Sequence, residues 1–532
     1  MNKVTCSYTS LIEPIIVNTS SNHGHAISGR RTFVTQWISI TLLWALVLWR
    51  LRQPELYYPL FKDKAVLFYT LFIAWTVLAG VCWSVAKALS IFNSGTFLGG
   101  LLTYFIGYTA SDKTSRYSYK ALLGLGFLLV LYTFYQGFIL NTGRPSGMLG
   151  NWNTHAALLA MILLPGIITY TLQSSASKLQ LGFWSIMCLL FAFAMGLTLS
   201  RGAILIFATA VACIIILGWR QKLSIKYGLI FLSAFNDGDT CLMVYSSVTL
   251  SCNAWAATEA SSLVALGSGR HLLWLPAWEM YLDRPYLGWG LGTFHLLHAQ
   301  YKPPLSTEAG FFAHNDYLQI LLELGPLGLI IFLCFIFIIC RRLVNLTLKY
   351  TPDFSAYKIE AFALLATCVG ILVHTFFTFH LYQLTIQIIW GYYLGRAARN
   401  ITVSADAAVE PVPQKLAGKA IWFYRGFCTV VIILVVTFGL SFYFTYKAAN
   451  TKDQQQALEY HRISGIFFPM VERYEVFSAQ DLYLELQQLN PDKDKLERQK
   501  IANLALNRIA VAIQKMPANA EVYHTKAEMG KS

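Results

Sequence analysis

The feature that most constrains this chain is the recurrence of apolar segments about 20 residues long. Hydrophobic residues make up 56% of the 532 positions, whereas charged residues make up only 13%. A bilayer core roughly 30 Å thick needs about 20 apolar residues per helix, because a helix satisfies every backbone polar group internally. The sequence therefore predicts an all-α polytopic membrane protein.

The predicted membrane spans number about twelve. They run over 33–49, 65–83, 92–110, 121–140, 153–173, 181–198, 202–218, 227–248, 317–340, 359–379, 381–396 and 422–446. Most Lys and Arg residues between spans fall on one side, and the opposite short loops hold only Lys87, Arg144 and Arg201. The basic side faces the cytoplasm. The opposite side is therefore the outside, which in a bacterium is the periplasmic side of the inner membrane, and we expect the active site there.

The same pattern predicts the domain organisation. The expected parts are a polar N-terminal tail at 1–32, eight spans within 33–248, a large periplasmic loop at 249–315, three spans within 316–396, a cytoplasmic linker at 397–421, a twelfth span at 422–446 and a periplasmic helical tail at 447–532. The end of this tail has small and large apolar residues at helical spacing, as in a truncated tetratricopeptide repeat. Such helical pairs stack on one another, so we expect the tail to be a docking or supporting element of the protein.

Two stretches fit this topology poorly. Arg30 and Arg31 precede a first span that would begin outside the cytoplasm, where basic residues are disfavoured. The polar run Asn236–Asp239 interrupts the eighth span, where each Asp at the bilayer centre would cost roughly 2.5–3.5 kcal/mol. The N-terminal topology and the role of this interruption are left open.

The formal net charge of +14 raises the question of nucleic acid as a partner. The basic residues lie between apolar segments, where they select topology, and they form no basic face with interleaved aromatic residues. We therefore expect no nucleic-acid partner.

Two arginines on the predicted periplasmic side suit an anionic ligand. Arg201 lies between two spans in LTLSRGAIL, either as an interfacial anchor or as an anion ligand. Arg270 lies in GSGRH at a predicted helix start, where free N–H groups and a planar guanidinium match phosphate oxygens. Together they predict a diphosphate clamp, and Arg144 adds a further cation on that side.

His314 opens the segment AHNDYLQILLELG, where the polar loop meets the ninth span. Histidine titrates near neutrality, so it suits abstraction of a proton from a sugar hydroxyl, and a structural hydrogen bond is the alternative. Asn315 and Asp316 are candidates for orienting it and for contacting substrate, although capping of the next helix would also explain them.

A metal site built from His314, Asp316, Glu308 and His295 or His298 was weighed against the spacing of these residues. The sequence has no HExxH pattern, no close carboxylate cluster and no Cys/His pairing at ligand spacing. We expect no metal and no other cofactor.

The motifs LSRGA around Arg201, GSGR at 267, PYLGWGLGTF at 285 and HNDYLQILLELG at 314 resemble the O-antigen ligase superfamily. This superfamily includes lipopolysaccharide O-antigen ligases, related polymerases and bacterial protein O-oligosaccharyltransferases, and the resemblance covers roughly residues 65–396. It implies an all-helical GT-C type glycosyltransferase that uses undecaprenyl diphosphate as the glycan carrier, without metal or nucleotide. By position, the family's diphosphate-binding arginines fall on Arg201 and Arg270, and its general base falls on His314.

The resemblance leads us to expect an inverting transfer from the lipid-linked glycan donor. The acceptor is left open among lipid A core, a protein hydroxyl and a growing polysaccharide, and the extra span and tail look more like the protein-glycosylating branch. A transporter or flippase of lipid-linked glycan is the rival class, and it would place polar residues on broken helices near the midplane. A non-catalytic assembly subunit that recruits partners through its tail is the third reading.

Overall fold

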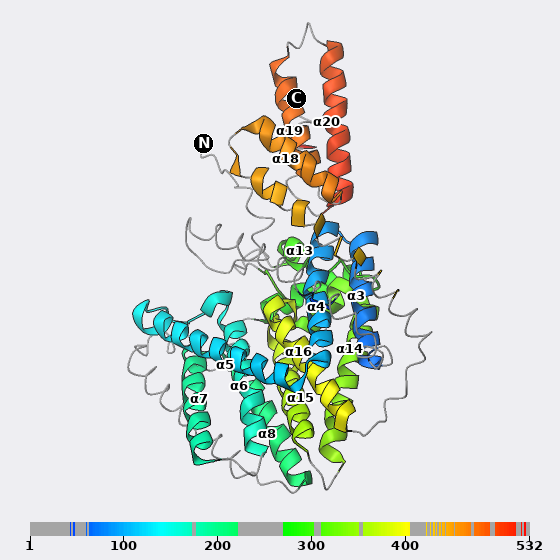
Figure 1. Cartoon of the computed structure of the whole chain (residues 1–532). Coiled ribbons are helices and arrows are strands. Elements are labelled where there is room, and N and C mark those ends of the chain that lie inside the picture. The colour runs from blue at the N-terminus through cyan, green and yellow to red at the C-terminus, as the bar shows by residue number, and fades with distance from the viewer. Residues whose placement is uncertain are drawn as a thin grey trace.

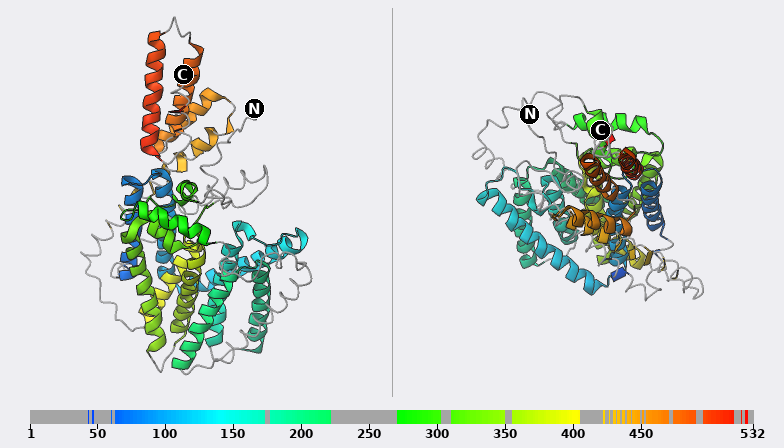
Figure 2. Two further views of the ribbon diagram at one scale, coloured as in Figure 1. Left: turned by 180° about the vertical axis from the view of Figure 1, so that it is seen from behind. Right: turned by 90° about the horizontal axis from the view of Figure 1, so that it is seen from above.

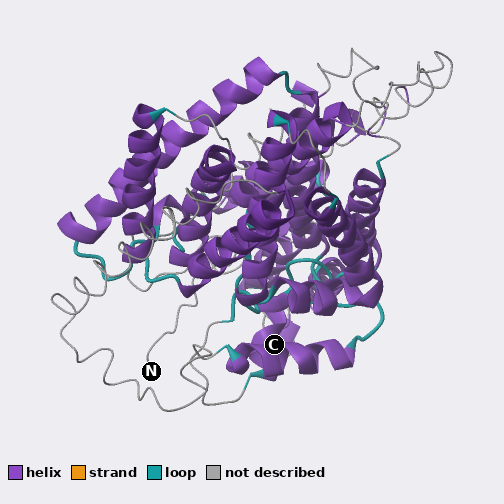
Figure 3. Cartoon of the chain, turned by 90° about the horizontal axis from the view of Figure 1, so that it is seen from below, coloured by secondary structure: helices purple, strands orange, loops and turns teal. Residues whose placement is uncertain are grey.

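The computed structural model of the chain describes residues 63–172, 177–221, 270–302, 310–349, 355–404, 453–469, 473–489 and 495–517, with scattered positions elsewhere. These parts consist of helices joined by turns and loops, and the described residues contain no strand (Figure 3). The all-α prediction is therefore confirmed for the described part of the chain.

Five helices form the central group of the bundle (Figure 1). They are α3 (Lys64–Cys82), α4 (Lys87–Thr109), α14 (Asp316–Leu348), α15 (Ala356–His374) and α16 (Leu384–Ser404). Helices α4 and α16 approach each other most closely, because glycines face backbone across the contact. A Cβ at Gly391 would lie 2.0 Å from the Gly100 carbonyl oxygen, and one at Gly395 would lie 1.9 Å from that of Tyr104. Small residues permit this close packing of membrane helices.

Four further helices pack along one side of this group (Figure 1). They are α5 (Asp112–Phe134), continued by a π-helical turn at Tyr135–Ile139, α6 (Trp152–Leu172), α7 (Lys178–Leu197) and α8 (Arg201–Gln221). Helices α6 and α8 contact α15, and α7 lies outermost.

Six helices of the described residues are long and apolar enough to cross a membrane. They are Lys64–Cys82, Lys87–Thr109, Asp112–Ile139, Trp152–Tyr170, Asp316–Leu348 and Ala356–Phe377, and two shorter apolar helices cover Gly182–Leu197 and Leu205–Gln221. The chain is thus a multi-pass membrane protein. The predicted spans 33–49 and 227–248, with the Asn236–Asp239 interruption, lie outside the described residues, so the total of twelve stays a prediction.

Several predicted boundaries differ from the structure: α4 begins at Lys87 and not at 92, α5 begins at Asp112 and not at 121, and α14 ends at Leu348 and not at 340. The difference that matters most for the site lies between α15 and α16. The predicted spans 359–379 and 381–396 leave almost no connection, but α15 ends at His374 and α16 begins only at Leu384. Two short 3-10 turns, Thr375–Phe377 and His380–Tyr382, fill the gap. The connection is missed because its residues are mostly apolar, so hydropathy does not separate it from the spans.

Helix α14 kinks at Gly325, whose φ is 71°, just before Pro326.

The remaining described elements lie beyond one end of the bundle. Helices α12 (His271–Asp283) and α13 (Phe294–Tyr301) cover that end. The tail helices α18 (Gln454–Phe467), α19 (Arg473–Gln488) and α20 (Lys495–Lys515) stand farther out on the same side (Figure 1). Helices α19 and α20 pack through the apolar side chains of Val476, Ala479, Ile509 and Ala512. The tail is helical as predicted, while its kinship with tetratricopeptide repeats stays a prediction.

Candidate active site

Four helix ends meet at the end of the bundle that α12 covers. Arg201 is the first residue of α8, and Arg270 is the N-cap of α12. His314 lies two residues before the start of α14, and His374 is the last residue of α15. The N-termini of three helices therefore face this end, and each carries the positive pole of its helix dipole.

His374 connects these helix ends physically. The first turn of α8 lies directly against its ring, because a Cβ added to Gly202 would be 1.5 Å from Nε2 of His374. On its other side, Nδ1 of His374 lies 2.8 Å from Nε2 of His380 in a hydrogen bond. Gly202 is the residue that lets α8, and with it Arg201, come so close to the histidine pair.

Arg270 lies over the adjoining turn and acts on His314. Its guanidinium carbon is 5.8 Å from the centre of the Phe377 ring, in the turn that follows His374. Burial, and then the positive charge of Arg270, lower the pKa of His314 to about 4. A histidine with this pKa is neutral at pH 7, so its ring can accept a proton.

His314 is held in an uncommon backbone conformation. Its φ is 52°, in the left-handed region that non-glycine residues rarely adopt. The imidazole packs edge-on against Phe379 with 5.0 Å between ring centres, and Phe379 stacks on Phe312 at 4.2 Å. Such local strain concentrates at functional sites, where surrounding packing enforces it.

The protein itself uses the side chains of Asn315 and Asp316. Oδ1 of Asn315 accepts hydrogen bonds from the N–H groups of Tyr317 and Leu318, each at 3.1 Å, and so caps α14. Asp316 is fully buried, and its Oδ2 accepts from the N–H of Leu381 at 2.9 Å. These bonds tie the His380 turn to the start of α14, so both side chains orient the site. Their predicted contact with substrate remains a prediction.

Arg144 lies in the loop before α6, with its side chain exposed. Its guanidinium carbon is 5.4 Å from the ring centre of Trp152, the first residue of α6. The next residue, Asn153, accepts a hydrogen bond from Ser200 at 2.7 Å, directly before Arg201. Arg144 is thus at the same end of the bundle as the other cations, on the α6 side.

Sequence reasoning missed His374, His380 and Glu323. The two histidines stand six residues apart in HTFFTFH, and this polar pair within an apolar run was a signal for a site. Glu323 lies inside an apolar helix, and its carboxylate accepts hydrogen bonds from the N–H of Gly292 at 2.6 Å and of Phe294 at 3.1 Å. It thereby fixes the glycine-rich loop of 286–294 against the kink of α14, which favours a packing role for that loop.

The described residues contain no group of three His, Cys, Asp or Glu side chains placed to hold a metal ion. Glu308, one of the residues weighed for such a site, lies outside them. Independence of metal remains a prediction.

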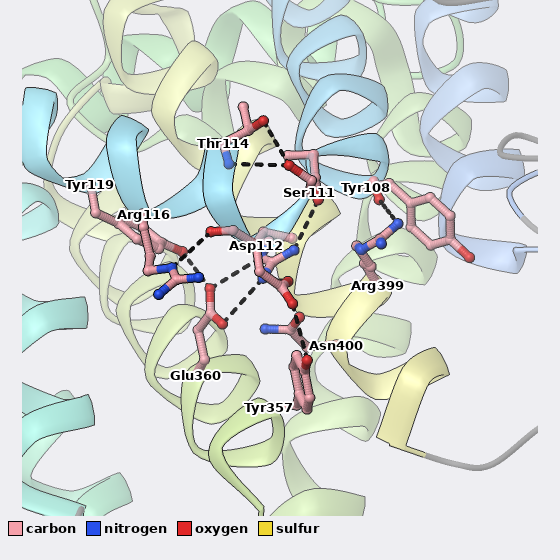
Figure 4. A network of polar contacts seen from close by, with 12 residues as sticks. Tyr108, Ser111, Asp112, Thr114, Arg116, Tyr119, Tyr357, Glu360, Arg399 and Asn400 are labelled. Atoms are coloured by element: carbon pink, nitrogen blue, oxygen red, sulfur yellow. Dashed lines mark hydrogen bonds and ion pairs between the residues drawn. The ribbon is translucent and has the colours of Figure 1, made fainter. Parts of the chain in front are cut away.

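A second polar cluster lies at the opposite end of α15 (Figure 4). The buried Arg396 donates to Glu360 at 3.1 Å, to Asp112 at 2.5 Å and to the Ala110 carbonyl at 3.0 Å. The hydroxyl of Tyr357 also donates to Asp112, at 3.0 Å. Because Glu360 and Tyr357 precede His374 on α15 and a helix rises about 1.5 Å per residue, this cluster lies roughly 21–26 Å from His374 along the helix. It joins the α4–α5 turn to α15 and α16 on the far side of the predicted membrane.

Comparisons with known proteins find two similarities. Residues 186–333 match the family described as O-antigen ligase, and this stretch contains Arg201, Arg270 and His314. A protein of Rickettsia conorii that is named as a polysaccharide ligase is 24% identical over 296 residues, which cover 52% of this chain and 68% of that relative.

Proposed function

Because the chain belongs to the O-antigen ligase superfamily, we propose that it is a membrane glycosyltransferase. It transfers a glycan from undecaprenyl diphosphate to an acceptor hydroxyl on the periplasmic side of the bacterial inner membrane. The reaction is inverting and needs neither metal nor nucleotide.

One observation carries this proposal. Arg270, the start of α8 at Arg201, and His314 converge on His374 and its hydrogen-bonded neighbour His380. The convergence brings together two features: helix N-termini with the cation Arg270, and a neutral, proton-accepting histidine. A lipid diphosphate needs the first, and an acceptor hydroxyl needs the second.

The chemistry follows from this division. His314 takes the proton of the acceptor hydroxyl, whose oxygen forms a bond to the anomeric carbon from the face opposite the carrier. The bond between that carbon and the diphosphate oxygen breaks, and both electrons leave with the diphosphate. Negative charge therefore grows on the leaving group, where Arg201, Arg270 and the helix N-termini stabilise it. Each charge-assisted hydrogen bond contributes roughly 1.5–3 kcal/mol.

The acceptor belongs to one of three classes: lipid A core, a protein hydroxyl or a growing polysaccharide. The Rickettsia relative is named for polysaccharide, whereas the helical tail beyond the active-site end suits a protein acceptor. Removing residues 447–532 separates these classes. Loss of protein glycosylation with retained lipid or polysaccharide transfer would assign the tail to docking of a protein acceptor.

The proposal is tested with purified protein in liposomes and a defined undecaprenyl-diphosphate oligosaccharide. Each acceptor class is added in turn, with and without EDTA, and product is followed by mass spectrometry. We expect transfer to one class that survives chelation. Movement of the donor across the bilayer without transfer would assign the chain to the flippases instead, and rescue of EDTA-treated protein by a divalent cation would overturn the metal-free mechanism.

A further inference from the structure

The side chains of α12 divide into three groups around the helix. One side packs into the protein, where Ala277 and Met280 are fully buried against Phe294 and Leu322. About 180° away, at 100° per residue, lies a stripe of exposed apolar side chains. Its members are Leu275, Trp278 and Leu282, which are 64%, 47% and 57% exposed.

The acidic residues of α12 occupy a separate flank. Glu279 and Asp283 are exposed and lie about 90° from both the buried side and the apolar stripe. From Leu275 onward the helix therefore presents protein-facing, apolar and charged sides in distinct directions. In the first turn, the exposed Leu272 lies at the angle of the acidic flank. An ordinary surface helix has only two such sides, a buried one and a polar one.

The position of α12 accounts for the third side. Figure 2 shows the helix lying across the active-site end of the bundle at its outer margin, transverse to the spans. In this orientation one side faces inward to the bundle, one faces outward and one faces away from the membrane along the bundle axis.

The apolar stripe continues onto the lipid-facing surface of a membrane span. Tyr286, which follows α12, is 82% exposed, and its carbonyl touches α14 so closely that a Cβ at Gly325 would lie 2.1 Å from the oxygen. Leu327 and Ile330 follow on α14 and are exposed on a helix that is apolar enough to cross a membrane. The stripe thus borders an exposed apolar surface on a helix that is long and apolar enough to span the membrane.

We propose that α12 lies in the headgroup region of the membrane, with Leu275, Trp278 and Leu282 in lipid and Glu279 and Asp283 in water. Interfacial helices have this division, and Trp and Tyr are enriched at this depth. Since Arg270 is the N-cap of α12, the bilayer itself then sets the height of that arginine. This last step rests on the proposed function, because headgroup depth is where the diphosphate of a membrane-anchored donor lies.

The test places a photoreactive p-benzoylphenylalanine at 278 or 282, and at 279 or 283 as matched controls on the same helix. Native membranes are irradiated, and the adducts are identified by mass spectrometry. We expect lipid adducts at 278 and 282 in at least about fivefold excess over 279 and 283. A protein adduct at the stripe, or equal lipid labelling at all four positions, would overturn the proposal.

A second measurement links the helix to the donor. Trp278→Glu places a charge in lipid at an exposed position, so the fold should persist, while the apparent KM for donor in liposomes should rise about tenfold. Glu279→Gln serves as the control and should leave KM unchanged. An unchanged KM in Trp278→Glu would remove the coupling to the donor. Lipid labelling needs no donor. If the stripe of α12 is not labelled by lipid but the protein still transfers glycan, the role of α12 is refuted and the proposed function stands.

Discussion

The two ends of α15 differ in how their charged and titratable side chains are paired. At the Glu360 end, guanidinium and hydroxyl groups donate hydrogen bonds to each carboxylate, and Arg396 is saturated by two carboxylates and a carbonyl. At the His374 end, Nδ1 of His380 and Oδ1 of Asp316 are buried without a hydrogen-bond partner among the described residues. At the Glu360 end, the neutral amide of Asn400 is buried without a partner among the described residues, but the charged groups are paired. Paired charges stabilise a fold, whereas buried titratable groups without a partner beside a strained backbone mark a site kept ready for a ligand.

Apart from the loss of His314, the largest effect that sharpens this contrast is expected at the arginines. Arg270→Lys keeps the charge but loses the planar fork, so transfer should fall roughly 10–150-fold, and Arg201→Lys should behave alike. The matched control is Arg284→Lys, at the other end of α12, where the guanidinium carbon lies 4.2 Å from the centre of the Trp289 ring. Initial rates with defined donor measure the effect. Wild-type rates in both lysine variants of the clamp would show that neither arginine is a shaped diphosphate ligand.

The next effect concerns the contact between Gly202 and His374. Gly202→Ala forces α8 and the histidine apart, because the new Cβ would otherwise lie 1.5 Å from Nε2. A displacement of this size in a catalytic arrangement should lower transfer roughly 10–100-fold. Gly182→Ala on α7 is the control, since a Cβ there meets nothing within 4 Å. Equal rates in the two variants would separate α8 from the site.

At the other end of α15, a substitution should change stability and leave chemistry alone. Arg396→Met strands Asp112 and Glu360, whose side chains are 45% and 21% exposed. Water screens the stranded charges in part, so we expect a loss of about 1–3 kcal/mol in unfolding free energy, less than for a fully buried pair. Transfer per folded molecule should stay within about twofold, since roughly 21–26 Å along α15 separates the clusters. Thermal unfolding in detergent and active-site-normalised rates measure the two quantities, and a large rate loss at unchanged stability would erase the contrast.

The smallest effect is a flat pH response. Burial and Arg270 lower the pKa of His314 to about 4, so its neutral, proton-accepting form prevails at every pH above that value. kcat/KM should therefore stay level from pH 8 down to about 5 and fall only as the pH drops through 4. An acidic limb near 6.5, the ordinary value for histidine, would show that His314 is not held in this environment or is not the base.

Most of the membrane architecture could be predicted because hydropathy reports directly on helices of about 20 residues. The predicted spans 65–83 and 153–173 differ from α3 and α6 by one residue at each end. The helix starts beside Arg270 and His314 were also predictable, since each lies where a polar stretch meets an apolar one, whereas the roles of the two residues stay predictions.

The connection that shapes the site could not be predicted in this way. Residues 375–383 are mostly apolar, so the predicted span 359–379 included His374 and the next one began directly after His380. In the structure these two histidines are hydrogen-bonded to each other, and their connection meets α8 and the start of α14. Their contacts join segments far apart in the chain, such as Asp316 with Leu381. Similarly, Glu323 gave no local sign that it binds the backbone of 292–294. Such long-range pairings depend on tertiary packing, which periodicity does not report.

The most direct test of the account separates donor binding from transfer in His314→Ala. Purified wild-type and variant proteins are placed in liposomes, donor affinity is measured by titration, and single-turnover transfer is followed with saturating acceptor. We predict a donor Kd within about twofold of wild type, because the arginines hold the diphosphate, and transfer lowered by about 10²–10⁴-fold through loss of the base. Transfer near the wild-type rate by a well-folded His314→Ala protein would contradict the account.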